Sequence, residues 1–163
     1  MTRKLEQTRD VTVALEAIGR RARDTTSAAD DIDLRFSCLR YRMLNGNFAN
    51  AHFLRADLTH AYANKADFSG ADLFYTSMRW INLSGTNLRN AVLSAADLTR
   101  SNLTDTDLTR AELDSANLSC ADLSGARLDG ADLREVRYRE TRWPDAFQPP
   151  PSTPDLEQLP STC

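Results

Sequence analysis

Residues 96–125 read ADLTR SNLTD TDLTR AELDS ANLSC ADLSG, which are six consecutive units of five residues with leucine third in each. The same register runs from Gly46 to Glu140, where thirteen of nineteen third positions are leucine and three are phenylalanine. Alanine takes the first position twelve times between Ala51 and Ala131. A fixed period of this kind indicates a repeat architecture, and it takes precedence over local signals for helices or strands.

Neither regular period accounts for a leucine at every fifth residue. A helix places apolar residues on one face at steps of 3.6, and a strand does so at steps of 2. We therefore expect a chain that turns a corner once per unit and keeps every third residue inside. Leucine or phenylalanine then fills the interior, alanine fits the tight space beside it, and the polar residues face water.

The units Ala56-Asp57-Leu58-Thr59-His60, Ala116-Asn117-Leu118-Ser119-Cys120 and Ala121-Asp122-Leu123-Ser124-Gly125 match the pattern A(D/N)LXX. The chain therefore resembles the pentapeptide-repeat family, as a bacterial member. The resemblance implies an all-β fold, a right-handed quadrilateral β-helix with four units per coil and about five coils. The third position departs from the pattern at Ala63, Met78 and Tyr138. We expect Phe48 or Phe68 to fill the space that Ala63 leaves.

Residues 1–31 precede the repeats and are expected to form a short N-terminal α-helix followed by a linker. Within residues 4–22, an apolar stripe consists of Val11, Ala14, Leu15, Ile18 and Ala22. We interpret this helix as a lid over the open end of the repeats, with a membrane-surface or partner-binding helix as the alternative. Residues 24–31 are small and polar, as in a linker.

The repeat domain is expected to span residues 32–143, with an irregular start. Leu44 precedes Phe48 by four residues instead of five, which predicts a one-residue deletion near Asn45-Gly46. At the other end, we expect Trp143 and Phe147 to close the last coil, because a stacked coil needs a cap. Residues 144–163 are rich in proline and are expected to form a disordered tail.

Composition excludes several classes of protein. A net charge of −3 gives no overall attraction to nucleic acid or to an anionic membrane. No apolar run approaches the ~20 residues needed to cross a bilayer. The three cysteines are an odd number without CxxC spacing, which argues against a disulfide framework and a zinc site. We therefore expect a cytoplasmic protein.

Unusual residues at the outward positions of the early repeats form a candidate partner surface. They are large and apolar or aromatic where the pattern favours serine, threonine or glycine, and they are Leu54, His60, Tyr62, Phe74, Tyr75 and Trp80. One interpretation is stacking along columns of residues twenty apart, such as Trp80 on Arg100. The other is a contact surface for a protein partner or for a second copy, in a monomer or weak homodimer.

The later repeats offer a candidate acidic surface, which consists of Asp97, Asp107, Glu112, Asp114, Asp122 and Asp132. Some pentapeptide-repeat proteins protect DNA gyrase from quinolones by mimicking duplex DNA, so the resemblance makes gyrase a possible partner. Charge argues against a close mimic. A rod of about 25 Å would need about fifteen negative charges, whereas residues 46–140 carry thirteen acidic and ten basic residues.

No arrangement of residues predicts catalysis. The only histidines are His52 and His60, and neither has a nucleophile at a suitable spacing. The aspartates recur because a short polar side chain in that position bonds the nearby backbone. We expect no catalytic, cofactor or metal site. The predicted function is a non-catalytic protein-interaction scaffold, with a gyrase-binding DNA mimic as the alternative.

Overall fold

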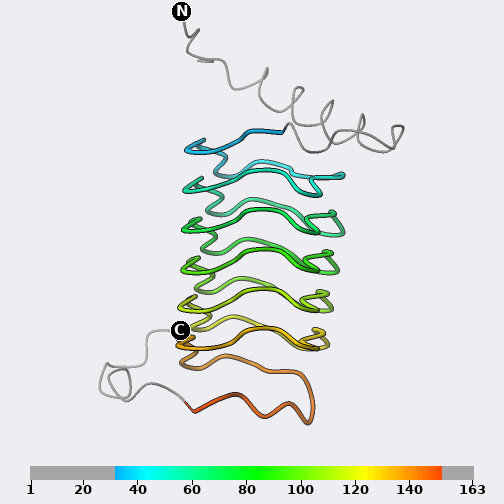
Figure 1. Ribbon diagram of the computed structural model, residues 1–163, viewed down its shortest axis with the longest axis vertical. Helices are drawn as coiled ribbons and strands as arrows, with labels where there is room; N and C mark the ends of the chain where they lie inside the picture. Colours follow the sequence, from blue (N-terminus) through cyan, green and yellow to red (C-terminus); the bar gives the residue numbers. More distant parts are fainter. Residues whose placement is uncertain (1–31, 152–163) are drawn as a thin grey trace, which may run out of the picture.

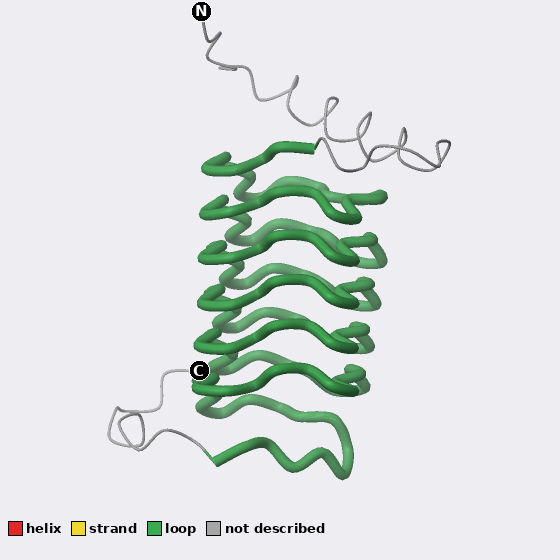
Figure 2. The backbone as a smooth tube through the Cα atoms, in the orientation of Figure 1, coloured by secondary structure: helices red, strands yellow, loops and turns green. Residues whose placement is uncertain are grey.

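The computed structural model describes residues 32–151, which wind into a rod of stacked coils along the long axis of the molecule (Figure 1). Within these residues there is no α-helix, and each strand is a single bridged residue between turns (Figure 2). The helix expected at residues 4–22, the linker at 24–31 and the last part of the tail lie outside the described residues.

Parallel pairing between coils confirms that four five-residue units make one turn of the rod. From Asn47↔Asp67 to Asp122↔Arg142, each bridged residue pairs with the residue twenty positions later. Hydrogen bonds run both ways between coils: the Leu58 amide donates to the Ser77 carbonyl oxygen at 2.8 Å, and the Ser77 amide donates to the Ala56 carbonyl oxygen at 3.0 Å. Equivalent positions in successive units therefore stack in columns.

The first coil contains the predicted deletion. The bridges Asp33↔His52, Cys38↔Asp57 and Met43↔Tyr62 join residues nineteen apart, whereas every later bridge joins residues twenty apart. The change of register falls between Met43 and Asn47, as the spacing of Leu44 and Phe48 predicts. Gly46 lies there with φ of 147°, a backbone conformation that glycine adopts readily.

The rod has four sides, each defined by one ladder of bridged residues. Side 1 contains Asn47, Asp67, Asn87, Asp107 and Arg127. Side 2 contains Asp33, His52, Asp72, Val92, Glu112 and Asp132. Side 3 contains Cys38, Asp57, Ser77, Asp97, Asn117 and Arg137. Side 4 contains Met43, Tyr62, Asn82, Asn102, Asp122 and Arg142.

Each corner is a tight turn in which the fifth residue of the unit has positive φ. At one of them, the Ala61 amide donates to the Leu58 carbonyl oxygen at 2.9 Å, and His60 has φ of 58°. A positive φ at the third residue of a turn is the type II geometry, which glycine adopts most easily. Most of these corners nevertheless carry other residues, and none carries Val, Ile or Thr, whose branched Cβ makes this conformation costly.

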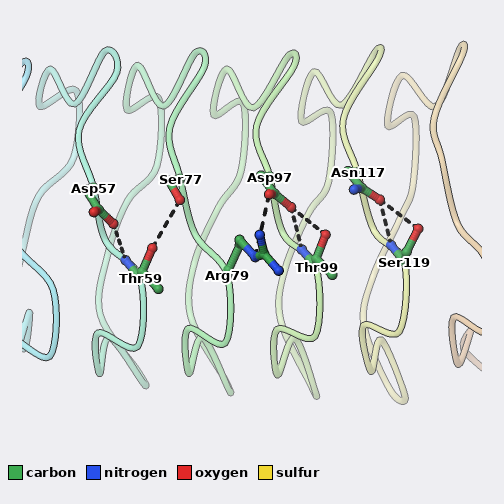
Figure 3. A network of polar contacts seen from close by, with 8 residues as sticks. All are labelled: Asp57, Thr59, Ser77, Arg79, Asp97, Thr99, Asn117 and Ser119. Carbon is green, nitrogen blue, oxygen red and sulfur yellow. Dashed lines mark hydrogen bonds and ion pairs between the residues drawn. The ribbon is translucent and has the colours of Figure 1, made fainter. Parts of the chain in front are cut away.

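The recurring aspartate or asparagine in each unit stabilises the adjacent corner. Asp57 Oδ1 accepts a hydrogen bond from the Thr59 amide at 3.0 Å, and Asp97 Oδ1 accepts one from the Thr99 amide at 3.1 Å. Figure 3 shows this pattern repeated along side 3. These oxygens accept hydrogen bonds from turn amides that have no partner in the ladder between coils. The interpretation of these residues as structural is confirmed.

The interior contains the third residue of every unit. Ala63 is the smallest of them and is completely buried. In the same core cluster, the rings of Phe48 and Phe68 stack with centroids 5.2 Å apart, and Phe53 packs against both at 5.9 and 5.4 Å. Both phenylalanines expected near Ala63, which follow side 1 ladder residues in successive coils, thus belong to one cluster with Phe53 of the adjoining side 2.

The C-terminal end of the rod is covered by aromatic side chains. Arg142 forms the last bridge, and Pro144 follows it without an amide proton to continue the ladder. The Trp143 ring lies 5.3 Å from Tyr138 and 5.2 Å from Phe147, measured between centroids. All three rings are partly buried against the core, and the Tyr138 hydroxyl donates to the carbonyl oxygen of Pro150.

Candidate partner-binding surfaces

Large exposed hydrophobic side chains are concentrated in the first half of the rod. Among the residues that the structure describes, they all lie between positions 36 and 80, and they are Phe36, Tyr41, Met43, Tyr62, Phe74, Tyr75 and Trp80. The later coils present mainly short polar and charged side chains. The rod therefore has an apolar, aromatic N-terminal half and a polar C-terminal half.

One group of these residues lines a shallow hollow on side 2. The hollow has a volume of about 650 Å³ and is lined by Phe36, Leu54, Arg55, Asp72, Phe74 and Val92. At its edge, the Phe74 and Tyr75 rings meet edge to face with centroids 4.7 Å apart. The Arg55 guanidinium carbon lies 5.7 Å from the Tyr75 ring centroid. We call this group the side 2 hollow.

The second group forms a column at the corner between sides 3 and 4, which we call the corner ladder. Tyr41 stacks on His60 with centroids 4.9 Å apart, and His60 stacks on Trp80 at 5.9 Å. The Arg100 guanidinium carbon continues the column 4.7 Å from the Trp80 ring centroid. The expected stacking of Trp80 on Arg100 is confirmed. Met43 and Tyr62 project from the adjoining ladder of side 4.

The six residues of the candidate partner surface are thus divided between two places. Leu54, Phe74 and Tyr75 belong to the side 2 hollow, whereas His60 and Trp80 belong to the corner ladder with Tyr62 beside them. Sequence reasoning missed Phe36, Tyr41 and Met43. A spacing of nineteen across the deletion would have placed them directly above Arg55, His60 and Tyr62.

The six residues of the candidate acidic surface are distributed over all four sides. Asp107 is on side 1 and Asp97 on side 3, while Asp122 is on side 4. The remaining three, on side 2, are Glu112 and Asp132 in the ladder and Asp114 two residues after Glu112. Side 2 is thus the only side on which several of the six gather.

Arginines also neutralise most of these carboxylates. Arg134 lies 2.6 Å from Asp132, Arg89 lies 3.2 Å from Asp107, Arg142 lies 3.5 Å from Asp122, and Arg79 lies 3.9 Å from Asp97, measured between nitrogen and oxygen. The Arg134 hydrogen bonds lower the pKa of Asp132. Burial acts to raise the pKa of Asp107, but hydrogen bonds from Thr109 and Arg89 outweigh it and lower that pKa.

The described residues contain no group of three or more histidine, cysteine or acidic side chains that could hold a metal ion. A second hollow, of about 550 Å³, lies at the change of register, and its lining is polar: Asn45, Gly46, Asn47, Asn64, Lys65 and Asp67. Cys38 is exposed with a free thiol. Cys120 is disulfide-bonded, which the odd number of cysteines did not predict.

No helix within residues 32–151 is long and apolar enough to cross a membrane.

Comparison with known proteins identifies the repeats. The family model described as pentapeptide repeats matches in overlapping segments, at residues 45–73, 51–90, 76–114 and 96–135. The solved structures include a pentapeptide repeat protein, Rfr23, from the cyanobacterium Cyanothece 51142. It is 28% identical with a TM-score of 0.60, and the alignment covers 69% of this chain and 88% of that one.

A second similar structure is a pentapeptide repeat protein from the thylakoid lumen of Arabidopsis thaliana. It is 26% identical with a TM-score of 0.56, and the alignment covers 71% of this chain and 77% of that one. No curated protein matches the chain.

Proposed function

Because this chain belongs to the pentapeptide-repeat family, we propose that it is a non-catalytic scaffold that binds a protein partner through the side 2 hollow. The observation that carries the proposal is the concentration of exposed aromatic side chains in the N-terminal half of the rod. Exposed apolar residues that adjoin one another commonly mark interaction sites. We also take the rod to be a right-handed β-helix, in keeping with the family.

The lining of the side 2 hollow indicates what a partner would present to it. Phe36, Leu54, Phe74 and Val92 offer an apolar floor, while Arg55 and Asp72 supply one charge of each sign. An apolar side chain of the partner would enter the hollow, and a flanking polar group would pair with either charge. Aromatic residues and arginine are the types most enriched at the energetic centres of protein interfaces.

The roles of the acidic residues support the absence of catalysis. The aspartates of the repeat accept hydrogen bonds from backbone amides two residues later, as in Asp67 with Ser69 and Asp122 with Ser124, both at 2.9 Å. A carboxylate occupied in this way stabilises a turn. Two histidines, His52 and His60, lie on different sides of the rod, and His60 is part of the corner ladder.

A pull-down from the native host, with identification by mass spectrometry, tests this proposal. We expect a partner that is captured by the unmodified chain and lost with the double variant Leu54→Ser and Phe74→Ser. Arg134→Ser is the matched control, because it occupies the same column of side 2 near the other end, and it should retain the partner. Equal capture by the double variant and the control would exclude the side 2 hollow as the binding surface.

Two further double variants separate the corner ladder from the hollow. Trp80→Ser combined with Tyr62→Ser alters only the corner ladder and the adjoining ladder of side 4, and it should leave capture unchanged. Phe74→Ser combined with Trp80→Ser alters both surfaces and should abolish capture. The melting temperature of each variant distinguishes lost binding from lost folding.

The gyrase-binding alternative has less support from the arrangement of charges. A mimic of duplex DNA presents regularly spaced charge that remains free to bind. Here the acidic residues are spread over four sides, and arginines neutralise four of the six. A gyrase supercoiling assay with and without quinolone tests this alternative. We expect no inhibition and no protection at micromolar concentrations of the chain.

A further inference from the structure

Side 4 differs from the other three sides in one of its outward columns, which carries small, uncharged residues. The residue after each interior position on this side is Asn45, Asn64, Ser84, Thr104 or Ser124. Sides 1, 2 and 3 carry arginines in the same column, among them Arg89, Arg134 and Arg79. The Thr104 hydroxyl donates to Ser84 Oγ at 2.9 Å, and the Thr104 amide donates to Asn102 Oδ1 at 3.1 Å. These contacts hold the polar groups of this column close to the surface, whereas Met43 and Tyr62 in the neighbouring ladder of side 4 project further and are 42% and 49% exposed.

The corner column that borders side 4 carries one charge of each sign on either side of a glycine. This column reads Lys65, Gly85, Asp105 and Gly125 in successive coils. Lys65 and Asp105 are two coils apart, about 10 Å at the usual spacing of paired strands. Neither forms an ion pair with another described residue. Side 4 therefore has a positive and a negative group without partners, placed evenly about Gly85.

This arrangement is complementary to itself under a two-fold rotation. The two-fold axis lies in the surface of side 4 at the level of Gly85 and runs perpendicular to the long axis of the rod. The rotation generates a second rod that runs antiparallel to the first. Each coil before Gly85 then faces, in the second copy, the coil that lies at the same distance after Gly85. Lys65 then meets Asp105 of the partner subunit, and Asp105 meets Lys65 of the partner subunit. The two ion pairs are equivalent, as an isologous interface requires.

The remaining contacts across this axis are compatible with close approach. Asn82 and Ser84 meet their own copies, which gives paired amide and hydroxyl groups. Tyr62 lies opposite Asn102 of the partner subunit, and Asn64 lies opposite Thr104 of the partner subunit. No two outward residues of side 4 with the same charge face each other. Trp80, in the corner ladder at the same level as Ser84, is 44% exposed and would lie beside its own copy.

We propose that two copies of this chain associate antiparallel through side 4, with reciprocal Lys65–Asp105 ion pairs on either side of the two-fold axis. The surface is separate from the side 2 hollow, so the dimer and the protein partner can be bound together. The proposal does not depend on the proposed function.

Charge reversal tests the ion pairs in the full chain. Sedimentation equilibrium should show a dimer for the unmodified chain and about a tenfold or larger increase in its dissociation constant for Lys65→Asp or Asp105→Lys, because like charges then face each other twice. The double variant Lys65→Asp and Asp105→Lys should restore the dimer. Arg110→Asp is the control: it changes charge in the equivalent column of side 1 and should leave the dissociation constant unchanged. A dissociation constant of Lys65→Asp equal to that of the unmodified chain would overturn the proposal, and so would a double variant that does not restore the dimer. An unmodified chain that remains monomeric at millimolar concentration would also overturn it.

Cross-linking tests the antiparallel orientation. In a Cys38→Ser background, Ser84→Cys places a thiol at the two-fold axis, whereas Ser124→Cys places one two coils away on the same column. A short bismaleimide should link two copies of the Ser84→Cys variant and leave the Ser124→Cys variant unlinked, because its thiols would be about 19 Å apart. Efficient linking of both variants would indicate parallel rods and contradict the proposal.

Discussion

Thr106 Oγ1 donates a hydrogen bond to the carbonyl oxygen of Leu83, 3.0 Å away and twenty-three residues earlier in the chain. Thr86 makes the same bond to Ala63 at 2.8 Å. These threonines replace alanine in the first position of their units and are almost completely buried. The hydroxyl of Ser101, also buried in this position, has no hydrogen-bond partner among the described residues.

Replacement of Thr106 and of Ser101 by alanine should therefore have different effects. Thr106→Ala removes a buried hydrogen bond and should lower the free energy of unfolding by about 1 kcal/mol. Ser101→Ala removes a buried hydroxyl without a partner and should leave that free energy unchanged or raise it by about 1 kcal/mol. Urea denaturation followed by circular dichroism measures both. Equal destabilisation by the two substitutions would show that the Thr106 hydrogen bond has no net effect.

Truncation of an interior leucine should produce a large loss of stability. Leu98 is completely buried on side 3, so Leu98→Ala should cost about 2–5 kcal/mol through lost contacts and an unfilled cavity. Leu98→Asp places an unpaired charge in the same position and should prevent folding of the rod. Thermal denaturation of the purified variants measures both effects. A melting temperature unaltered by Leu98→Asp would contradict the inward orientation of this side chain.

Substitution at a corner of the rod should cost more stability with a β-branched residue than with an unbranched one. Gly130 has φ of +69°, and a Cβ atom there would lie 3.6 Å from Arg110 Cγ, which is an ordinary contact. Gly130→Ala should therefore cost only the backbone strain of about 1–2 kcal/mol. Gly130→Val should cost more, because β-branched residues very rarely adopt this conformation. Comparison of the two free energies of unfolding tests this, and equal costs would be inconsistent with the observed φ.

The Asp33 carboxylate should remain ionised in acid solution. Arg35 donates hydrogen bonds of 2.9 and 2.6 Å to it, and these bonds lower the pKa of Asp33 from 3.8 to about 2. A lowered pKa in the folded chain means that the pair stabilises the fold above about pH 4 and loses this effect as pH falls towards 2. Carboxyl NMR titration should detect the low value.

Two substitutions separate this effect from a general effect of acid. Arg35→Gln removes the guanidinium donors and should return the pKa of Asp33 towards 3.8. Arg134→Gln removes the equivalent donors from Asp132, at the other end of side 2, and should raise the pKa of Asp132 without altering that of Asp33. An unchanged pKa of Asp33 in Arg35→Gln would show that the observed ion pair does not persist in solution.

Much of the fold could be predicted from local rules. The third residue of each unit lies inside, and the deletion near Gly46 appears as a change from nineteen to twenty in the pairing. The role of the aspartates followed from the short reach of their side chains to the next amide. These features depend on residues close together in sequence and on one repeated period, so the sequence contains all that is needed to place them.

The candidate surfaces needed the tertiary structure. Sequence position put Leu54, His60 and Trp80 in one patch, but the corners of the rod separate the side 2 hollow from the corner ladder. The acidic residues from Asp97 to Asp132 similarly appeared as one run, although they alternate among four sides and bind arginines from other coils. Neighbours in a sequence of five-residue units point in different directions, because each unit turns the chain through one corner.

The sequence by itself therefore determined the period, the interior and the turns of this rod, since each depends on a unit of five residues and its nearest neighbours. The tertiary structure decided which side chains share a surface and which charges remain without partners. Most of those contacts join residues eighteen to twenty positions apart. Their physical cause is the stacking of whole coils, which brings a column such as Lys65, Gly85 and Asp105 into line.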